Sequence, residues 1–153
     1  MAEGRAIVGR WLRAGRAGPY VLQAAIAALH SVATSPADTD WGRIVGLYDR
    51  LVAVAPSPVA ALNRAIALGE RDGPAAALSE LDALAEALGG YHLLHAARGD
   101  ALAALGRHEE AAAAFDRAIA LTSNAAEREL LHARRDAAAN ANAVLFGRCQ
   151  RKR

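Results

Sequence analysis

The residues best suited to metal chemistry in this chain are two histidines, His92 and His95. Their spacing of three can place both imidazoles on one face of a helix, and imidazole is a common metal ligand. Neither a cysteine pair nor an acidic residue in ligand register accompanies them. We therefore expect one histidine to pack in the fold and the other to lie on the surface, and we predict no metal and no cofactor.

A pair of adjacent carboxylates, Glu109 and Glu110, is the second candidate for chemistry. General acid–base catalysis needs two groups that converge across a pocket. These two stand in the first turn of a predicted helix, where the helix dipole favours negative charge. The chain also lacks a glycine-rich phosphate loop, a nucleophile elbow and a zinc signature. We predict that it is not an enzyme.

Polar residues inside otherwise apolar helices suggest binding. Gln23 and His30 are seven residues apart and so share one helix face. Asn63 and Arg64 lie in the first helix of a central repeat, where they either face a ligand or satisfy backbone groups between repeats. With His95, these residues form the predicted partner-binding groove.

The elements that position these residues are predicted to be helices. The 153 residues are one domain's worth of chain, with 41 alanines and only 5% aromatic residues, and alanine is the best helix former. Apolar residues recur at helical spacing, while proline and glycine mark helix starts and ends. The expected helices cover residues 3–15, 19–33, 41–54, 58–70, 74–88, 91–105, 108–121 and 125–139.

One short motif occurs three times at a nearly constant interval. Tyr48-Asp49 is followed 33 residues later by Leu81-Asp82 and 34 residues after that by Phe115-Asp116. A period near 34 is typical of tetratricopeptide repeats, which bury their apolar faces on one another. We predict an all-α fold, a right-handed superhelical stack of antiparallel helix pairs of tetratricopeptide-like type with about eight helices. The recurring aspartate is interpreted as a contact between repeats or as part of a solvated face.

The clearest repeat unit covers residues 91–124. In it, Gly99 is predicted to let two helices come close, and Ala111 to occupy a position that takes only a small side chain. Phe115 is expected to complete the contact between the two helices, and Gly106 to make the turn between them.

Charge is distributed unevenly along the chain. The net charge is +3 over residues 1–29, −6 over 30–127 and +5 over 128–153. We expect a repeat domain over residues 1–139 and a basic, disordered tail over 140–153. No apolar run approaches the roughly 18 residues of a membrane span, and the single cysteine, Cys149, allows no disulfide within the chain. These features predict a cytoplasmic protein that does not enter a membrane.

An ordered string of motifs resembles a known family. It comprises Gly18-Pro19-Tyr20, Gln23 to Ala28 with His30, Asp40-Trp41, Leu47-Tyr48-Asp49, Ser57-Pro58-Val59, Leu62 to Ala65, Tyr91, His95-Ala96, Leu105 to Arg107, Glu110-Ala111 and Asn124 to Arg128. Over about residues 2–132 the chain resembles the C-terminal, tetratricopeptide-like extension of a group of bacterial extracytoplasmic-function-type RNA polymerase sigma factors.

The resemblance implies a regulatory, protein-binding domain. The implied partners are the core domains of the sigma factor, RNA polymerase or a small regulatory protein. In the family, two DNA- and polymerase-binding domains precede this segment, whereas here Met1 stands directly before it, so we expect a severed or separately expressed half. Without a helix-turn-helix unit, no direct contact with promoter DNA is expected. The alternative is a stand-alone tetratricopeptide adaptor that binds a peptide or protein unrelated to transcription.

Overall fold

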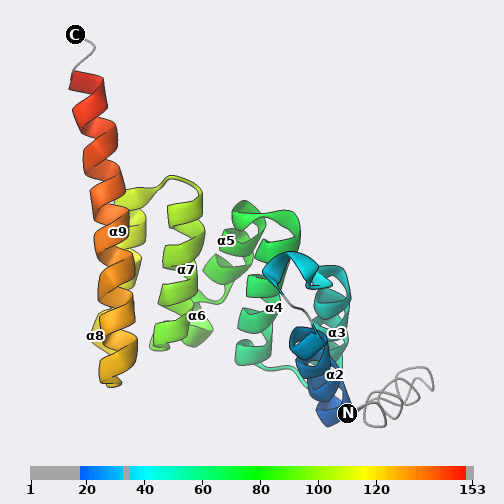
Figure 1. Ribbon diagram of the computed structural model, residues 1–153. Helices are drawn as coiled ribbons and strands as arrows, with labels where there is room; N and C mark the ends of the chain where they lie inside the picture. The colour runs from blue at the N-terminus through cyan, green and yellow to red at the C-terminus, as the bar shows by residue number, and fades with distance from the viewer. Residues whose placement is uncertain (1–17, 33–34, 151–153) are drawn as a thin grey trace. The chain divides into compact units, whose positions relative to one another are not determined.

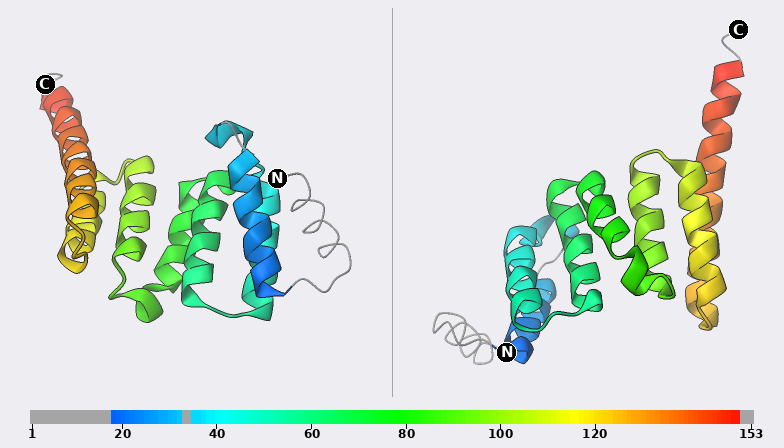
Figure 2. Two further views of the ribbon diagram at one scale, coloured as in Figure 1. Left: turned by 60° about the horizontal axis from the view of Figure 1, so that its bottom comes forward. Right: turned by 180° about the vertical axis from the view of Figure 1, so that it is seen from behind.

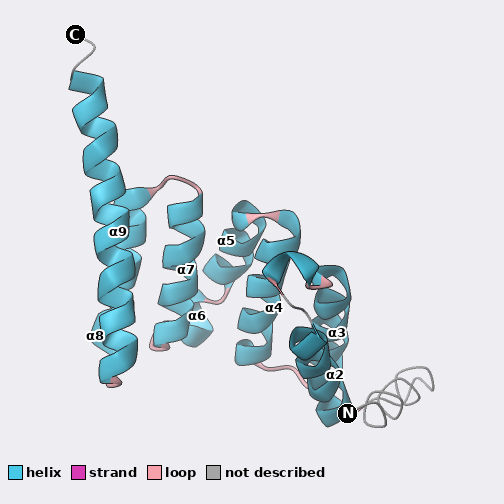
Figure 3. Cartoon of the chain, in the orientation of Figure 1, coloured by secondary structure: helices cyan, strands magenta, loops and turns pink. Residues whose placement is uncertain are grey.

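The computed structural model describes residues 18–32 and 35–150, and every regular element in these ranges is a helix (Figure 3). By its contacts, the chain divides between Arg71 and Asp72 into two compact units. The elements are α2 (Pro19–Val32), the short 3-10 helix η1 (Pro36–Asp38), α3 (Trp41–Val54), α4 (Pro58–Asp72), α5 (Pro74–Ala83), α6 (Ala85–Leu88), α7 (His92–Ala104), α8 (His108–Leu121) and α9 (Ala125–Gln150).

Several helix starts follow from local capping chemistry. The Asp40 carboxylate accepts a hydrogen bond from the Arg43 N–H at 3.0 Å and caps α3. The Asn124 side chain does the same for α9, with the N–H groups of Ala126 and Glu127 at 3.0 and 3.3 Å. Prolines stand at the first position of α2, α4 and α5, where a missing N–H costs little.

The first unit contains α2, α3 and α4. Helices α2 and α3 pack side by side (Figure 1). Fully buried side chains from each of the three helices form its core, namely Leu22 of α2, Ile44 and Val45 of α3, and Leu62 and Ala65 of α4. This core therefore holds α2, which carries the candidate groove residues Gln23 and His30, together with α4, which carries Asn63.

The second unit contains α5 to α9. Helix α8 packs against both α7 and α9, and α5 packs against α7; α7, α8 and α9 run alongside one another in the views of Figure 1 and Figure 2. The buried residues at these contacts include Leu81, Leu94, Phe115 and Leu131. Gly106 adopts a positive φ of 75° in the turn between α7 and α8, which accounts for the glycine predicted there.

Helices α7 and α8 approach closely where Gly99 faces Phe115. A Cβ atom placed on Gly99 would lie 2.6 Å from the Phe115 ring, well inside van der Waals contact. The ring is only 1% exposed, and the neighbouring Ala111 is fully buried. The predicted roles of Gly99 and Phe115 in this helix pair are thus confirmed, whereas the limit on side-chain size at Ala111 stays a prediction.

Replacing Gly99 with alanine is expected to destabilise the protein by up to about 2 kcal/mol. Overpacking of a full core typically costs about 1–3 kcal/mol, and the better helix propensity of alanine offsets about 1 kcal/mol of that. Gly46 provides the matched control, because it is exposed in α3 and a Cβ there meets nothing within 4 Å. Gly46→Ala should raise stability by about 0.5–1 kcal/mol. Urea denaturation of both variants measures the two changes, and a stabilised Gly99→Ala variant would contradict the close approach.

Three predicted elements differ from the structure or fall outside it. The helix expected over residues 74–88 is two helices, because Leu84 (φ −90°, ψ −1°) forms a tight turn in which its N–H donates to the Leu81 carbonyl. The last helix does not end near residue 139 but continues to Gln150, since Asn140 and Asn142 are only weakly unfavourable in an alanine-rich helix. The helix predicted over residues 3–15 lies outside the described residues. The boundary between a 1–139 domain and a 140–153 tail stays a prediction.

Candidate partner-binding groove

A groove of about 490 Å³ opens on the first unit between α2, α3 and α4. Such a volume is in the range of small ligand sites and of pockets that take a few side chains. Its lining consists of Pro19, Gln23, Ile26, Ala27, His30, Tyr48, Leu51, Ala55, Ser57, Val59, Ala60 and Asn63.

The groove combines an apolar floor with a polar rim. Ile26 and Leu51 are buried at 5% and 3% exposure and form part of the floor. Gln23, His30 and Asn63 are exposed, so their side chains are available to a bound molecule. The structure therefore brings together three of the five residues that the sequence proposed for a groove. That they bind a partner stays a prediction.

His30 is held in place by an aromatic neighbour. Its ring packs edge-on against Trp41, with the ring centroids 5.6 Å apart and the planes 69° apart. This is a favourable geometry for two aromatic rings. Trp41, at the start of α3, thus orients an imidazole that lines the groove on α2.

Sequence reasoning missed several residues of the groove, above all Tyr48. Its position in the repeat motif indicated a buried packing residue, and it is indeed half-buried, but it also lines the groove. Burial raises the pKa of its phenol above the ordinary value. The hydroxyl therefore stays protonated at neutral pH and can both donate and accept a hydrogen bond. The sequence did offer a signal for this role, because Tyr48 is a polar phenol among the apolar residues on one face of its helix.

Arg64 does not line this groove. Its Nε donates to the Asp49 carboxylate of α3 at 2.6 Å. This ion pair joins α3 to α4 through side chains. It is not the backbone contact that the sequence offered as one role for Arg64, and the ligand-facing role stays a prediction.

The same kind of ion pair recurs in the second unit. Arg98 of α7 lies 2.7 Å from Asp82 of α5, and Arg135 of α9 lies 3.5 Å from Asp116 of α8. The three aspartates at the recurring repeat position therefore each pair with an arginine from a later helix. The interpretation of the recurring aspartate as a contact between repeats is confirmed, although each carboxylate remains about half exposed.

Loss of the Arg64 ion pair should have a small effect on stability. Exposed ion pairs contribute about 0.2–1 kcal/mol, and the Asp49 side chain is 51% exposed. Arg64→Ala is therefore expected to lower the free energy of unfolding by no more than about 1 kcal/mol. Asn63 is adjacent to Arg64 in the sequence but lines the groove, and Asn63→Ala should leave the thermal midpoint nearly unchanged. Chemical denaturation compares the two, and a loss of several kcal/mol for Arg64→Ala would show that the pair is a dominant contact.

His95 lies in the second unit and is not part of the groove described above. Its Nε2 is 2.9 Å from the Gly89 carbonyl oxygen at the end of α6, a hydrogen bond that ties α7 to the preceding turn. It also borders a second, shallower hollow of about 340 Å³ with Arg98, Glu110 and Arg117. The geometry gives His95 a positional role in the fold.

The other candidates for chemistry are engaged in structural contacts. His92 Nε2 lies 3.1 Å from a carboxylate oxygen of Glu127 without making a hydrogen bond to it. That oxygen accepts a hydrogen bond from the Thr122 hydroxyl at 2.8 Å. Glu110 accepts two hydrogen bonds from the Arg107 guanidinium at 2.7 and 2.6 Å. These bonds hold the pKa of the Glu110 carboxyl below its usual range. In the described part of the chain, no three histidine, cysteine, aspartate or glutamate side chains converge as metal ligands would.

None of the described helices combines the length and the apolar character that crossing a bilayer demands.

Comparison with known proteins identifies a sequence relative and a structural neighbour. No family model matches the chain. An uncharacterized protein, R00370, of Rhizobium meliloti (strain 1021) is 48% identical over 127 residues, which are 83% of this chain and 30% of that protein. This chain thus spans less than a third of the length of that relative.

The structural likeness is to a solved structure described as "MamA RS-1 ArsTM double mutant". The TM-score is 0.53 at 18% sequence identity, and the match covers 99% of this chain and 97% of the other. At this identity the likeness establishes the fold alone. The chain therefore has an all-helical, tetratricopeptide-like fold, as the period of its repeats predicted.

Proposed function

We propose that this chain is a regulatory, protein-binding domain of a bacterial RNA polymerase sigma factor, which modulates transcription initiation through protein contacts. The observation that carries the proposal is the ordered set of motifs between Gly18 and Arg128 that resembles the C-terminal extension of such factors. The chain is 48% identical to a segment that makes up 30% of a longer protein. This partial match supports the proposal, because a domain that extends a longer protein would match only part of that protein.

The groove between α2, α3 and α4 is the part of the fold that suits this role. Helical repeat stacks present extended surfaces to protein partners. The exposed Gln23, His30 and Asn63 provide hydrogen-bonding groups beside an apolar floor, which is the usual composition of a recognition site.

Two purified probes test the proposal. One is the part of the Rhizobium meliloti relative that lies outside the matched segment, and the other is core RNA polymerase from the same organism. We expect the immobilised chain to retain at least one of them with a dissociation constant of about 10 µM or tighter. Absence of retention for both probes at that concentration contradicts the proposed function.

A stand-alone tetratricopeptide adaptor remains the second candidate. The all-helical, tetratricopeptide-like fold supports it, because helical repeat stacks present surfaces to protein partners whatever the process they serve. An adaptor of this kind would bind a peptide or protein but neither sigma-factor domains nor polymerase. Retention of a partner other than the two probes, together with no effect of the chain on transcription in vitro, would favour this alternative.

A further inference from the structure

The groove on the first unit is formed without any formally charged side chain. Its twelve lining residues include no aspartate, glutamate, lysine or arginine. Helix α2, which supplies one wall, has none along its fourteen residues. Yet α2 is not buried on all sides, because Tyr20 is 85% exposed and Gln23, Ala27 and His30 are also exposed. A solvent-facing helix normally carries charged residues on its outer face.

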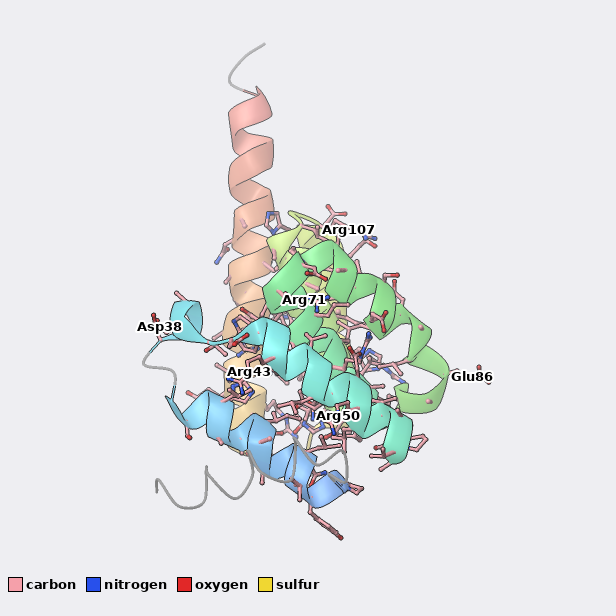
Figure 4. All side chains as sticks on the ribbon, turned by 90° about the vertical axis from the view of Figure 1, so that its right-hand side faces the viewer. Asp38, Arg43, Arg50, Arg71, Glu86 and Arg107 are labelled. Atoms are coloured by element: carbon pink, nitrogen blue, oxygen red, sulfur yellow. The ribbon has the colours of Figure 1, made fainter. Side chains whose placement is uncertain are left out.

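Charged side chains do occur in this unit, but outside the groove. Asp40 caps α3 by accepting a hydrogen bond from the Arg43 backbone N–H. Asp49 of α3 forms an ion pair with Arg64 of α4. Figure 4 labels Arg43 and Arg50 on α3, and neither lines the groove. The neutral lining is therefore a local property of one surface and not of the unit as a whole. Depletion of charge with aromatic enrichment is typical of the centre of a protein interface.

We propose that this groove binds an uncharged, apolar segment of the protein partner, one that offers hydroxyl, amide or backbone groups to Gln23, Asn63 and Tyr48. This inference rests on the proposed protein-binding function and names the chemistry of the partner. Apolar side chains of the segment pack on Ile26, Leu51 and Val59, which line the groove.

The physical reason for this selectivity is desolvation. A charge brought into the groove would lose water without meeting an opposite charge, which is strongly unfavourable. The side-chain amides impose a second condition. Once a partner covers them, an unsatisfied donor or acceptor is costly. An entirely apolar segment without hydrogen-bonding groups is therefore a poor occupant as well.

Isosteric charge substitutions test the inference. Gln23→Glu and Asn63→Asp each add one negative charge to the groove with almost no change in shape. The control is Asn140→Asp, which makes the same chemical change at an exposed position of α9. With the outside part of the Rhizobium meliloti relative and core RNA polymerase as probes, we expect both groove variants to bind at least about 10-fold more weakly, equivalent to about 1.4 kcal/mol. Asn140→Asp should bind as the unsubstituted chain does.

Salt dependence provides an independent readout. Because the groove carries no charge, affinity should change by less than about threefold between about 0.1 and 1 M NaCl, a range over which the screening length falls from about 10 to 3 Å. In a Trp11→Phe background, Trp41 is the sole tryptophan and contacts His30. Its fluorescence should therefore change when a probe binds.

The outcomes separate the two proposals. Probe binding that is unaffected by both groove variants, or that weakens steeply with salt, or that leaves Trp41 fluorescence unchanged, overturns the inference and leaves the protein-binding function in place. Failure of both probes to bind the unsubstituted chain overturns both. Circular dichroism of each variant confirms that it is folded before binding is compared.

Discussion

Phe115→Ala is expected to lower the free energy of unfolding by about 3–5 kcal/mol, the typical cost of removing a buried phenylalanine ring. The ring is 1% exposed and fills the space left by Gly99, so no neighbouring side chain can easily take its place. Since a domain of this size is stable by only about 5–15 kcal/mol, the variant should lose a large part of its stability. Urea denaturation followed by circular dichroism measures the loss.

A control and a second substitution sharpen this result. Leu130 of α9 is 54% exposed, so Leu130→Ala should change stability by less than about 0.5 kcal/mol, as surface substitutions usually do. In the Phe115→Ala background, Gly99→Ala should no longer destabilise, because the clashing ring is gone and alanine favours the helix. A loss for Phe115→Ala no larger than that for Leu130→Ala would contradict the packing described for α7 and α8.

Leu22→Ala should produce the second large effect, a loss of about 2–5 kcal/mol. Leu22 is fully buried in the first unit, on α2. This helix lacks formally charged side chains, so apolar packing is its main means of attachment. A loosened α2 would also displace Gln23 and His30, and binding through the groove should weaken together with stability.

Tyr20→Ala, on the same helix, is the matched control for Leu22→Ala. Tyr20 is 85% exposed, and its removal should change the free energy of unfolding by no more than about 0.5 kcal/mol. Thermal or urea denaturation and a binding assay on the same preparations provide both readouts. If Leu22→Ala retained full stability, α2 could not be anchored by its buried face.

Much of the helix architecture was predictable because its signals are local. Asp40 and Asn124 cap helices by hydrogen bonds to N–H groups within the next three residues, and Pro58 and Pro74 stand in first turns. Gly99 and Phe115 were predictable for a different reason. Their spacing belongs to a repeat pattern in which a small residue on one helix faces an aromatic ring on the next.

The errors arose where no local residue marks the outcome. No glycine or proline stands near Leu84, so a single helix over 74–88 was the natural expectation, and only packing within the second unit accounts for the tight turn. Asn140 and Asn142 suggest that the last helix ends near residue 139, whereas α9 continues to Gln150. In an alanine-rich segment such residues reduce helix propensity only slightly.

The all-helical class and most helix starts follow from the amino-acid sequence alone, since they depend on contacts within one or two turns, and the repeat period is itself a sequence pattern. Which polar residues share a surface depends on the packing of the helices. This packing placed Gln23, His30 and Asn63 in one groove, but turned Arg64 toward Asp49 and tied His95 to Gly89. Adjacent residues such as Asn63 and Arg64 point in different directions on a helix, and their partners lie many residues away. Their roles therefore depend on how the helices pack.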